Sequence, residues 1–218
     1  MFIVDNSEEN WKALHYLNEW CEISSQFDIA TGYFEVSSLI AMDGNWQKLD
    51  KIRILMGDEV SLRTKQAFKK ALSKKLEALD ESIEDEKEGN EFLTGVSAVI
   101  EAIRTKKIEC KVYKKGKFHA KAYITYDRSK VRPPIGLVGS ANFTYSGLTS
   151  NIELNVQIET GADVKILQEW YEKYWEEAED VTEEVLEVIE KHTKEYTPFQ
   201  VYAKSLQEYL RGHEETTS

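Results

Sequence analysis

The spacing of hydrophobic residues along the chain predicts strands and helices in alternation. Apolar residues three or four positions apart are typical of helices, and short alternating or continuous apolar runs are typical of strands. We expect strands over 27–30, 51–57, 108–113, 118–126, 135–140 and 151–159. We expect helices over 10–27, 37–42, 61–79, 91–105, 164–177, 181–192 and 201–210, with an acidic, polar break over 81–90.

This order of elements predicts an α/β fold in which helices cover a sheet. Three closely spaced strands between 118 and 159 indicate a mixed sheet with a local meander. The chain has 218 residues, of which 41% are hydrophobic, so it is large enough for one domain with its own core. The helices after residue 160 are rich in Glu, and we expect them to present a solvated acidic face or a docking surface.

Several protein classes do not fit the composition. The first ten residues contain neither a basic nor a long apolar region, so we expect no secretory signal. No apolar run approaches the roughly 18 residues needed to span a bilayer, so we expect no membrane partner. Cys21 and Cys110 lie far apart and form no CxxC pattern. They are typical of reduced, buried thiols, and we expect a cytoplasmic protein.

The charge is distributed unevenly. The net charge is −11, yet residues 104–132 carry eleven Lys and Arg side chains and two acids, which gives this segment roughly +9. Such a segment suits a partner that carries phosphate groups, met at one place on an acidic body. A solvated, lysine-rich loop explains the same count, and charge alone does not separate the two.

The expected strand 118–126 places two chemically useful side chains on one face. Successive side chains of a strand point to opposite faces, so His119, Lys121 and Tyr123 share one face. The other face is apolar and anchors the strand. Tyr33 and Phe34, which follow the first strand, could line a cleft or stack on a base, but we favour core packing. Core packing is also our interpretation of Trp170, Tyr171, Tyr174 and Trp175, which lie at helical spacing.

A second polar group follows the expected strand 135–140. Gly139 allows a tight turn, and Ser140 and Asn142 can donate hydrogen bonds to an anion. Glu153 could accept the Nδ1 proton of His119, fixing its tautomer and leaving Nε2 free to attack.

These groups together can act on a phosphodiester without a metal ion. An imidazole is the nucleophile, and an ammonium and an amide hold the phosphoryl oxygens as charge develops. The four histidines, His15, His119, His192 and His213, show no zinc-like spacing, and the chain has no Walker-type phosphate loop. We therefore expect no metal and no cofactor.

The segments HAK and GSANFT, with a glutamate downstream, resemble the phospholipase D superfamily signature HxK(x)4D(x)6GSxN. The matching residues are His119, Lys121, Gly139, Ser140 and Asn142, with Glu153 at the place of the acid that orients the histidine. The signature's Asp position is Tyr126 here, and Asp127 comes one residue late. In a strand that shift turns a side chain to the other face, so Asp127 can fill the supporting role only across a bulge.

The resemblance implies a phospholipase D-like layered fold, a mixed sheet flanked by helices with extra acidic helices at the C-terminal side. Residues 1–160 would form the domain core, 161–197 flanking helices, and 198–218 a C-terminal helix and tail, or a linker to further domains. It also implies catalysis through a phosphohistidine on His119, with Lys121, Ser140 and Asn142 binding the phosphate. Because the family uses two motifs per active site and this chain has one, it implies a homodimer, with a second partner domain as the other possibility.

The chain also resembles the phospholipase D-like module of bacterial superfamily-two helicases and some restriction endonucleases. The segments that carry this resemblance are IATGYF, ILMG, FHAKAYI and GLVGSANFTYSGLTSNIELNV. That resemblance covers about the first 160 residues and implies a nuclease module, acting on DNA, of a longer protein with additional helicase domains. An alternative is a non-catalytic DNA-binding and dimerisation module of a helicase. We rank a lipid-acting phospholipase below both, because a second motif, a membrane anchor and a basic amphipathic helix are missing.

Overall fold

The computed structural model describes residues 2–57 and 86–194. The expected helices over 61–79 and 201–210, the tail over 198–218 and the first part of the acidic break lie outside these ranges. In the described residues, no helix is long and apolar enough to cross a membrane.

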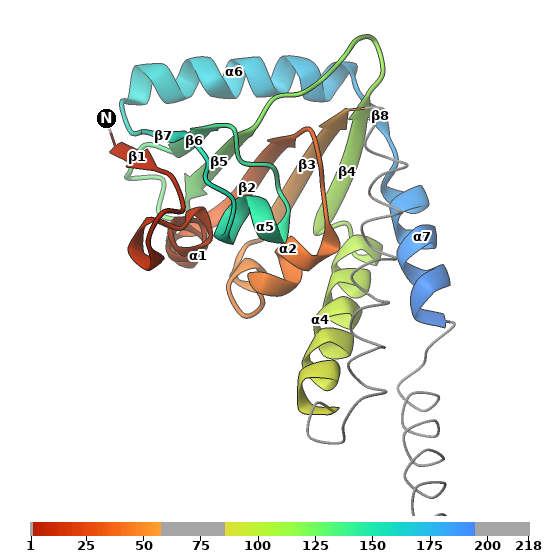
Figure 1. Cartoon of the computed structure of the whole chain (residues 1–218). Helices are drawn as coiled ribbons and strands as arrows, with labels where there is room; N and C mark the ends of the chain where they lie inside the picture. The colour runs from red at the N-terminus through yellow and green to blue at the C-terminus, as the bar shows by residue number, and fades with distance from the viewer. Residues whose placement is uncertain (1, 58–85, 195–218) are drawn as a thin grey trace, which may run out of the picture.

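A single mixed sheet organises the described part of the chain (Figure 1). Its eight strands lie in the order β1-β7-β6-β5-β2-β3-β4-β8. The strands β2, β3 and β4 are mutually parallel, and the other neighbours pair antiparallel. Their bounds are β1 Phe2–Val4, β2 Ser24–Thr31, β3 Lys51–Gly57, β4 Ile108–Tyr113, β5 Ala122–Asp127, β6 Ile135–Gly139, β7 Asn155–Ile158 and β8 Glu179–Asp180.

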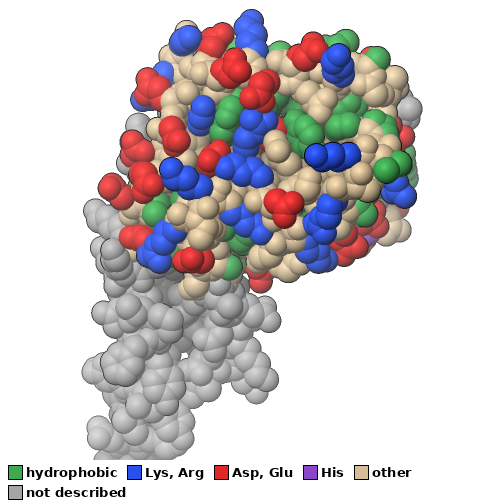
Figure 2. Space-filling view, turned by 180° about the vertical axis from the view of Figure 1, so that it is seen from behind, with side chains coloured by type: hydrophobic (Ala, Val, Ile, Leu, Met, Phe, Trp, Pro, Cys, Tyr) green, Lys and Arg blue, Asp and Glu red, His purple; other side chains and the backbone are tan. Residues whose placement is uncertain are grey.

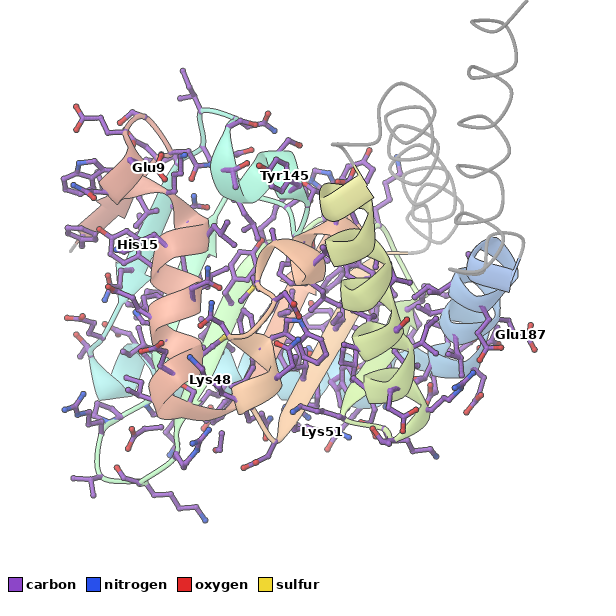
Figure 3. All side chains as sticks on the ribbon, turned by 90° about the horizontal axis from the view of Figure 1, so that it is seen from below. Glu9, His15, Lys48, Lys51, Tyr145 and Glu187 are labelled. Carbon is purple, nitrogen blue, oxygen red and sulfur yellow. The ribbon has the colours of Figure 1, made fainter. Side chains whose placement is uncertain are left out.

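Helices cover both faces of the sheet. Figure 1 shows α6 (Gly161–Glu177) lying along one face. The opposite face carries the other helices, and Figure 3 looks onto that layer. These are α1 (Ala13–Ile23), α2 (Val36–Ala41), α4 (Glu86–Arg104), α5 (Tyr145–Thr149) and α7 (Thr182–Lys194), with short 3-10 turns at Glu9–Trp11 and Trp46–Lys48.

Each face has its own hydrophobic core, because alternate residues of a strand point to opposite sides. On the larger side, Phe27 and Ile29 of β2 pack with residues of α1, α2 and α4. On the other side, Ala30 of β2 packs in the cluster that contains Tyr171 and Trp175 of α6. Burial of Tyr171 and Trp175 confirms their core role, whereas their neighbours Trp170 and Tyr174 are half-buried.

The expected α/β fold is confirmed, and two strands, 51–57 and 108–113, have the expected bounds. The helix expected over 10–27 is wrong at its end, because β2 begins at Ser24 and pairs with both β3 and β5. The break expected over 81–90 is wrong from Glu86, where α4 begins. The pattern did not predict β1, β8 or α5, which contain three, two and five residues. Elements this short do not contain enough residues to show a hydrophobic period.

The strand expected over 118–126 is shorter, since β5 starts at Ala122. Its predicted alternation still holds, because Phe118, Ala122 and Ile124 lie in the α6-side cluster and Tyr123 lies in the other. The strand expected over 151–159 is reduced to β7, and residues 151–154 form an irregular segment before it. Both irregular segments carry candidate site residues. The division of the chain at residue 160 stays a prediction.

Candidate active site

The candidate residues meet at one end of the sheet because of its topology. β5 runs antiparallel to both β2 and β6, so its start lies beside their ends. His119 and Lys121 immediately precede β5, Ser140 and Asn142 follow β6, and the turn at Gly32–Tyr33 follows β2. Figure 3 shows Tyr145, three residues after Asn142, at the end of the sheet opposite Lys48 and Lys51.

His119 and Lys121 are in direct contact. Lys121 Nζ lies 2.7 Å from His119 Nδ1 and donates a hydrogen bond to the His119 carbonyl oxygen at 3.0 Å. The imidazole is exposed, whereas Lys121 is only 8% exposed. Burial lowers the pKa of Lys121, and the Glu153 carboxylate acts in the opposite direction. The site therefore holds a poorly solvated ammonium beside a solvent-accessible imidazole.

Asn142 lies at the same turn as the imidazole, since both side chains border the Cβ position of Gly32, and it has a fixed orientation. Its Oδ1 accepts a hydrogen bond from the Tyr33 backbone N–H at 3.1 Å. In the described residues, Asn142 Nδ2 makes no hydrogen bond with another protein group. A carbonyl that is already bonded to a backbone donor leaves the NH₂ group to face a ligand. The amide can therefore donate to an anion, as the sequence predicts.

Ser140 and Glu153 form a second pair in the site. Ser140 Oγ donates to Glu153 Oε2 and accepts from the Leu154 backbone N–H at 2.9 Å. The hydrogen bond expected between Glu153 and His119 Nδ1 is absent from the described residues, because Nδ1 faces Lys121 and the carboxylate faces Ser140. Glu153 acts on the site electrostatically, by favouring the charged form of Lys121.

Gly139 supports the loop that carries Ser140 and Asn142. A Cβ atom at this position would lie 2.1 Å from the Leu154 carbonyl oxygen and 2.5 Å from Asn155 Oδ1. Asn155 is fully buried, accepts from the Ala141 N–H at 3.2 Å and donates to the Val4 carbonyl at 3.0 Å. The role of Asn155 was not predicted. In the sequence it is simply one of the polar residues that alternate with apolar residues in NIELNV.

Asp127 lies away from these groups. It hydrogen-bonds the Ser129 hydroxyl and the Arg132 backbone N–H in the loop after β5, and the Ser129 bond lowers the pKa of Asp127. The side chain at the signature's Asp position, Tyr126, instead donates to Asp28 Oδ2 at 2.6 Å. The carboxylate near the signature's Asp position is therefore that of Asp28, which lies on the neighbouring strand β2. In the sequence, Asp28 is marked only as a single acid within the apolar run FDIA.

The cationic segment 104–132 does not gather at one place. Several of its members pair with acids of the C-terminal helices and of β8: Arg104 with Glu190, Lys114 with Glu179, and Lys115 with Glu177. Arg128, Lys130 and Arg132 follow β5, about 20 Å from its start by strand geometry. Viewed from behind, Lys and Arg side chains alternate with Asp and Glu across the surface (Figure 2). At the site end, exposed Lys117 and buried Lys121 flank His119.

The side chains outside this cluster offer no obvious alternative chemistry. In the part of the chain that the structure describes, no group of three or more His, Cys, Asp or Glu could hold a metal ion. Both Cys21 and Cys110 are free and buried, and burial raises the pKa of each thiol to about 12. Neither thiol is therefore suited to act as a nucleophile near neutral pH.

Comparison with known proteins identifies similar sequences and folds. The family model described as cardiolipin synthase, PLD-like domain, matches residues 21–175. NucT from Helicobacter pylori is 16% identical, with a TM-score of 0.50 over 82% of this chain and 96% of NucT. The phospholipase D family member Nuc from Salmonella typhimurium is 14% identical, with a TM-score of 0.44 over 77% of this chain and 87% of Nuc.

The chain also resembles part of a larger protein. TrmBL2, an archaeal chromatin protein, is 16% identical, with a TM-score of 0.47 over 83% of this chain. The matched region spans only 54% of TrmBL2, so the likeness concerns one part of that protein. No curated protein matches the chain. At these identities the structural likenesses concern the fold alone.

Proposed function

Because the chain belongs to the family described as cardiolipin synthase, PLD-like domain, we propose that it is a phosphodiesterase that cleaves nucleic acid without a metal ion. The observation that carries the proposal is the contact of His119 with Lys121 and the placement of Asn142 and His119 around the turn at Gly32, at one end of the strands. A nucleophile, a buried cation and an oriented amide donor form a site suited to a phosphoryl group.

The reaction proceeds in two displacements. His119 Nε2 attacks phosphorus, a P–N bond forms, and the P–O bond to the leaving group breaks as that oxygen receives a proton from a second imidazole. Water then attacks the phosphohistidine, gives its proton to the same second imidazole, and the P–N bond breaks. Lys121 and Asn142 bind the non-bridging oxygens throughout, and Ser140 helps to position them.

The contact seen between Lys121 and His119 sets the starting state. An ammonium can only donate, so Nδ1 accepts and the proton of a neutral imidazole resides on Nε2. Nε2 can attack only after Lys121 turns to a phosphate oxygen and Nδ1 takes up the proton. Phosphate binding therefore activates the nucleophile.

The second imidazole comes from a second copy of the chain. The sequence contains one copy of the combined motif, HAK at 119–121 followed by GSAN at 139–142, so a single protomer supplies one histidine to the reaction. Large apolar side chains are exposed beside the site: Ile152 is 87% exposed, Leu154 60% and Tyr145 53%. The Leu154 carbonyl oxygen accepts from the Ser140 backbone N–H at 3.1 Å, and the Leu154 N–H donates to the Ser140 hydroxyl at 2.9 Å, which places this apolar surface at the rim of the site. Its burial in a homodimer would bring the two His119 side chains together.

The substrate that we propose is DNA, and the chain acts as the nuclease module of a helicase or restriction system. Exposed Lys117 beside His119 supports a polyanionic substrate, and the sequence resemblance supports the context. The two buried, unpaired thiols suit a reducing compartment, so we place the activity in the cytoplasm.

A second candidate is a DNA-binding and dimerisation module without catalysis. The observation that favours it is the missing bond between Glu153 and His119, since an imidazole without an orienting carboxylate is a weaker nucleophile. DNA affinity that falls with salt, with no turnover and no effect of His119→Ala, would select this candidate.

Cleavage of DNA in excess EDTA tests the first candidate. We expect the wild type to cleave labelled single-stranded or double-stranded DNA, and His119→Ala to lose cleavage while keeping its fold by circular dichroism. Arg132→Ala serves as a matched control, because Arg132 is an exposed cation in the loop after β5, at the opposite end of that strand from His119. Equal residual activity of the wild type and His119→Ala would refute the proposal.

A further inference from the structure

The turn after β2 closes the site from the side opposite β5. Gly32 is buried, and a Cβ atom at its position would lie 3.0 Å from His119 Cδ2 and 3.1 Å from Asn142 Oδ1. These separations are tighter than nine in ten Cβ contacts, so a side chain at this position would require His119 or Asn142 to shift by a few tenths of an ångström. The absence of a side chain at Gly32 therefore gives the imidazole and the amide room against the turn.

The next residue fixes the amide. The Tyr33 N–H donates to Asn142 Oδ1 at 3.1 Å, and the Tyr33 ring meets the His119 imidazole edge to face, with centroids 6.4 Å apart. Tyr33 is half-buried, whereas Phe34 is 1% exposed and stacks on Phe143. Core packing, expected for both aromatic residues, thus holds for Phe34, and Tyr33 faces the site.

The turn itself is held rigidly. Thr31 is fully buried, and its hydroxyl donates to the Tyr33 carbonyl oxygen at 2.5 Å and accepts from the Phe143 N–H at 3.0 Å. A backbone hydrogen bond from Glu35 to the Phe143 carbonyl at 3.0 Å continues the connection. The end of β2 and the loop after β6 are therefore joined as one unit, which restricts how far Asn142 can move.

We propose that Gly32 and Tyr33 form a positioning element that holds the Asn142 amide and the His119 imidazole in the geometry that receives a phosphate. Tyr33 N–H fixes which end of the Asn142 amide faces the ligand, and Gly32 provides the space for both groups. Neither residue forms or breaks a bond in the reaction, and both act through their contacts with His119 and Asn142. This inference rests on the proposed function of the site, and the experiments below separate the two.

The first experiment compares two glycine variants. Gly32→Ala places a methyl group against His119 and Asn142. Gly161→Ala is the matched control, because a Cβ there would meet only Pro133 Cβ at 3.8 Å. We expect Gly32→Ala to lower kcat for DNA cleavage by about 100-fold while KM and the unfolding midpoint change little, as misplaced reacting groups do. Wild-type kcat in Gly32→Ala, or a loss that only follows unfolding, would overturn the proposal.

The second experiment needs no turnover. The ¹H–¹⁵N spectrum contains the side-chain NH₂ signal of Asn142, which can be assigned by its loss in Asn142→Asp. Inorganic phosphate should shift this signal in the wild type and in Gly161→Ala, and should shift it several-fold less at the same concentration in Gly32→Ala. Asn142→Asp should fold normally, because its carboxylate still accepts from Tyr33.

These outcomes separate the positioning element from the reaction. A phosphate-dependent shift of the Asn142 NH₂ group without DNA cleavage would support the positioning element and reject the proposed reaction. If the wild type cleaves DNA but phosphate does not shift the Asn142 NH₂ signal, the positioning element is rejected and the proposed reaction is not. If Gly32→Ala fails to fold, the wild-type titration still decides whether the NH₂ group faces the ligand.

Discussion

Two cations lie largely out of solvent in this sheet region, the half-buried Arg53 on β3 and the buried Lys121 before β5, and their surroundings differ sharply. Arg53 makes two hydrogen bonds to the fully buried Asp28, at 2.7 and 2.8 Å, and two to Glu172. It also lies 5.1 Å from the ring centroids of Tyr171 and Trp175. Among the described residues, the Lys121 ammonium has polar contacts with the ring and the carbonyl oxygen of His119 and forms no ion pair with a carboxylate.

The pKa shifts follow the same contrast. Burial alone would lower the pKa of Arg53, but its hydrogen bonds to Asp28 and Glu172 raise that pKa. Burial lowers the pKa of Lys121, and the Glu153 carboxylate offsets only part of this. A buried cation with all its partners in place stabilises the fold, whereas one without a carboxylate partner can bind an anion from outside. The comparison separates a structural charge from a functional one.

The largest expected effect is the loss of activity in Lys121→Met. The substitution keeps the length of the side chain and removes the charge that holds the phosphoryl oxygens, so we expect kcat to fall by about 1,000-fold. The free energy of unfolding should stay the same or increase, because a poorly solvated charge is removed. Single-turnover cleavage and urea denaturation measure the two quantities. If Lys121→Met lost stability as well, Lys121 would be a structural cation like Arg53.

Asp28→Asn should show the reverse pattern. It leaves the half-buried Arg53 without its main counter-ion, so we expect a loss of about 3 kcal/mol in the free energy of unfolding. The activity of the folded fraction should stay near that of the wild type. Tyr126→Phe removes only the hydroxyl that donates to Asp28 and should cost about 1.5 kcal/mol. A larger loss of activity than of stability in either variant would place this network in the active site.

The smallest expected effect is a dependence on alkaline pH. The pKa of Lys121 lies below its ordinary value of 10.5 in the folded chain and near that value in the unfolded chain. Between the two pKa values the unfolded chain binds more protons, so the contribution of Lys121 to stability becomes more favourable as pH rises. The affinity for inorganic phosphate should fall over the same pH range, because the neutral amine no longer attracts an anion.

Lys121→Arg tests this dependence directly. Its guanidinium stays charged, so its phosphate affinity should lose the alkaline decrease that the wild type shows. A ³¹P NMR titration at pH 7 to 10 measures the affinity in both proteins. If the phosphate affinity of Lys121→Arg fell in the same way at alkaline pH, the decrease would be caused by a group other than Lys121.

The sequence predicted the central strands well, because their apolar runs are buried between neighbours on both sides. The runs over 51–57 and 108–113 became β3 and β4 without change. The first three residues of β2, Ser24–Gln26, were missed because they are polar and join the sheet only through pairing with β3 and β5. Local patterns cannot report pairing between segments that lie a hundred residues apart.

The sequence also identified the residues of the candidate site but not all their partners. The motif spacing indicated that His119, Lys121, Ser140 and Asn142 would meet, and the structure places all four at the same end of the sheet. The partner of Glu153 was wrong, since its side chain bonds Ser140 and not His119. The positioning turn at Gly32 and the carboxylate of Asp28 were missed, because their roles depend on contacts across strands that no motif records.

A trapped covalent intermediate tests the central claim most directly. Wild-type protein mixed with a 5′-labelled DNA oligonucleotide in EDTA and quenched in alkali, where phosphohistidine is stable and phosphoserine esters are not, should carry substrate on the peptide that contains His119. The adduct should be absent from His119→Ala and from Lys121→Met. Cleavage by the wild type with no adduct on His119, or an adduct on another residue, would contradict the account.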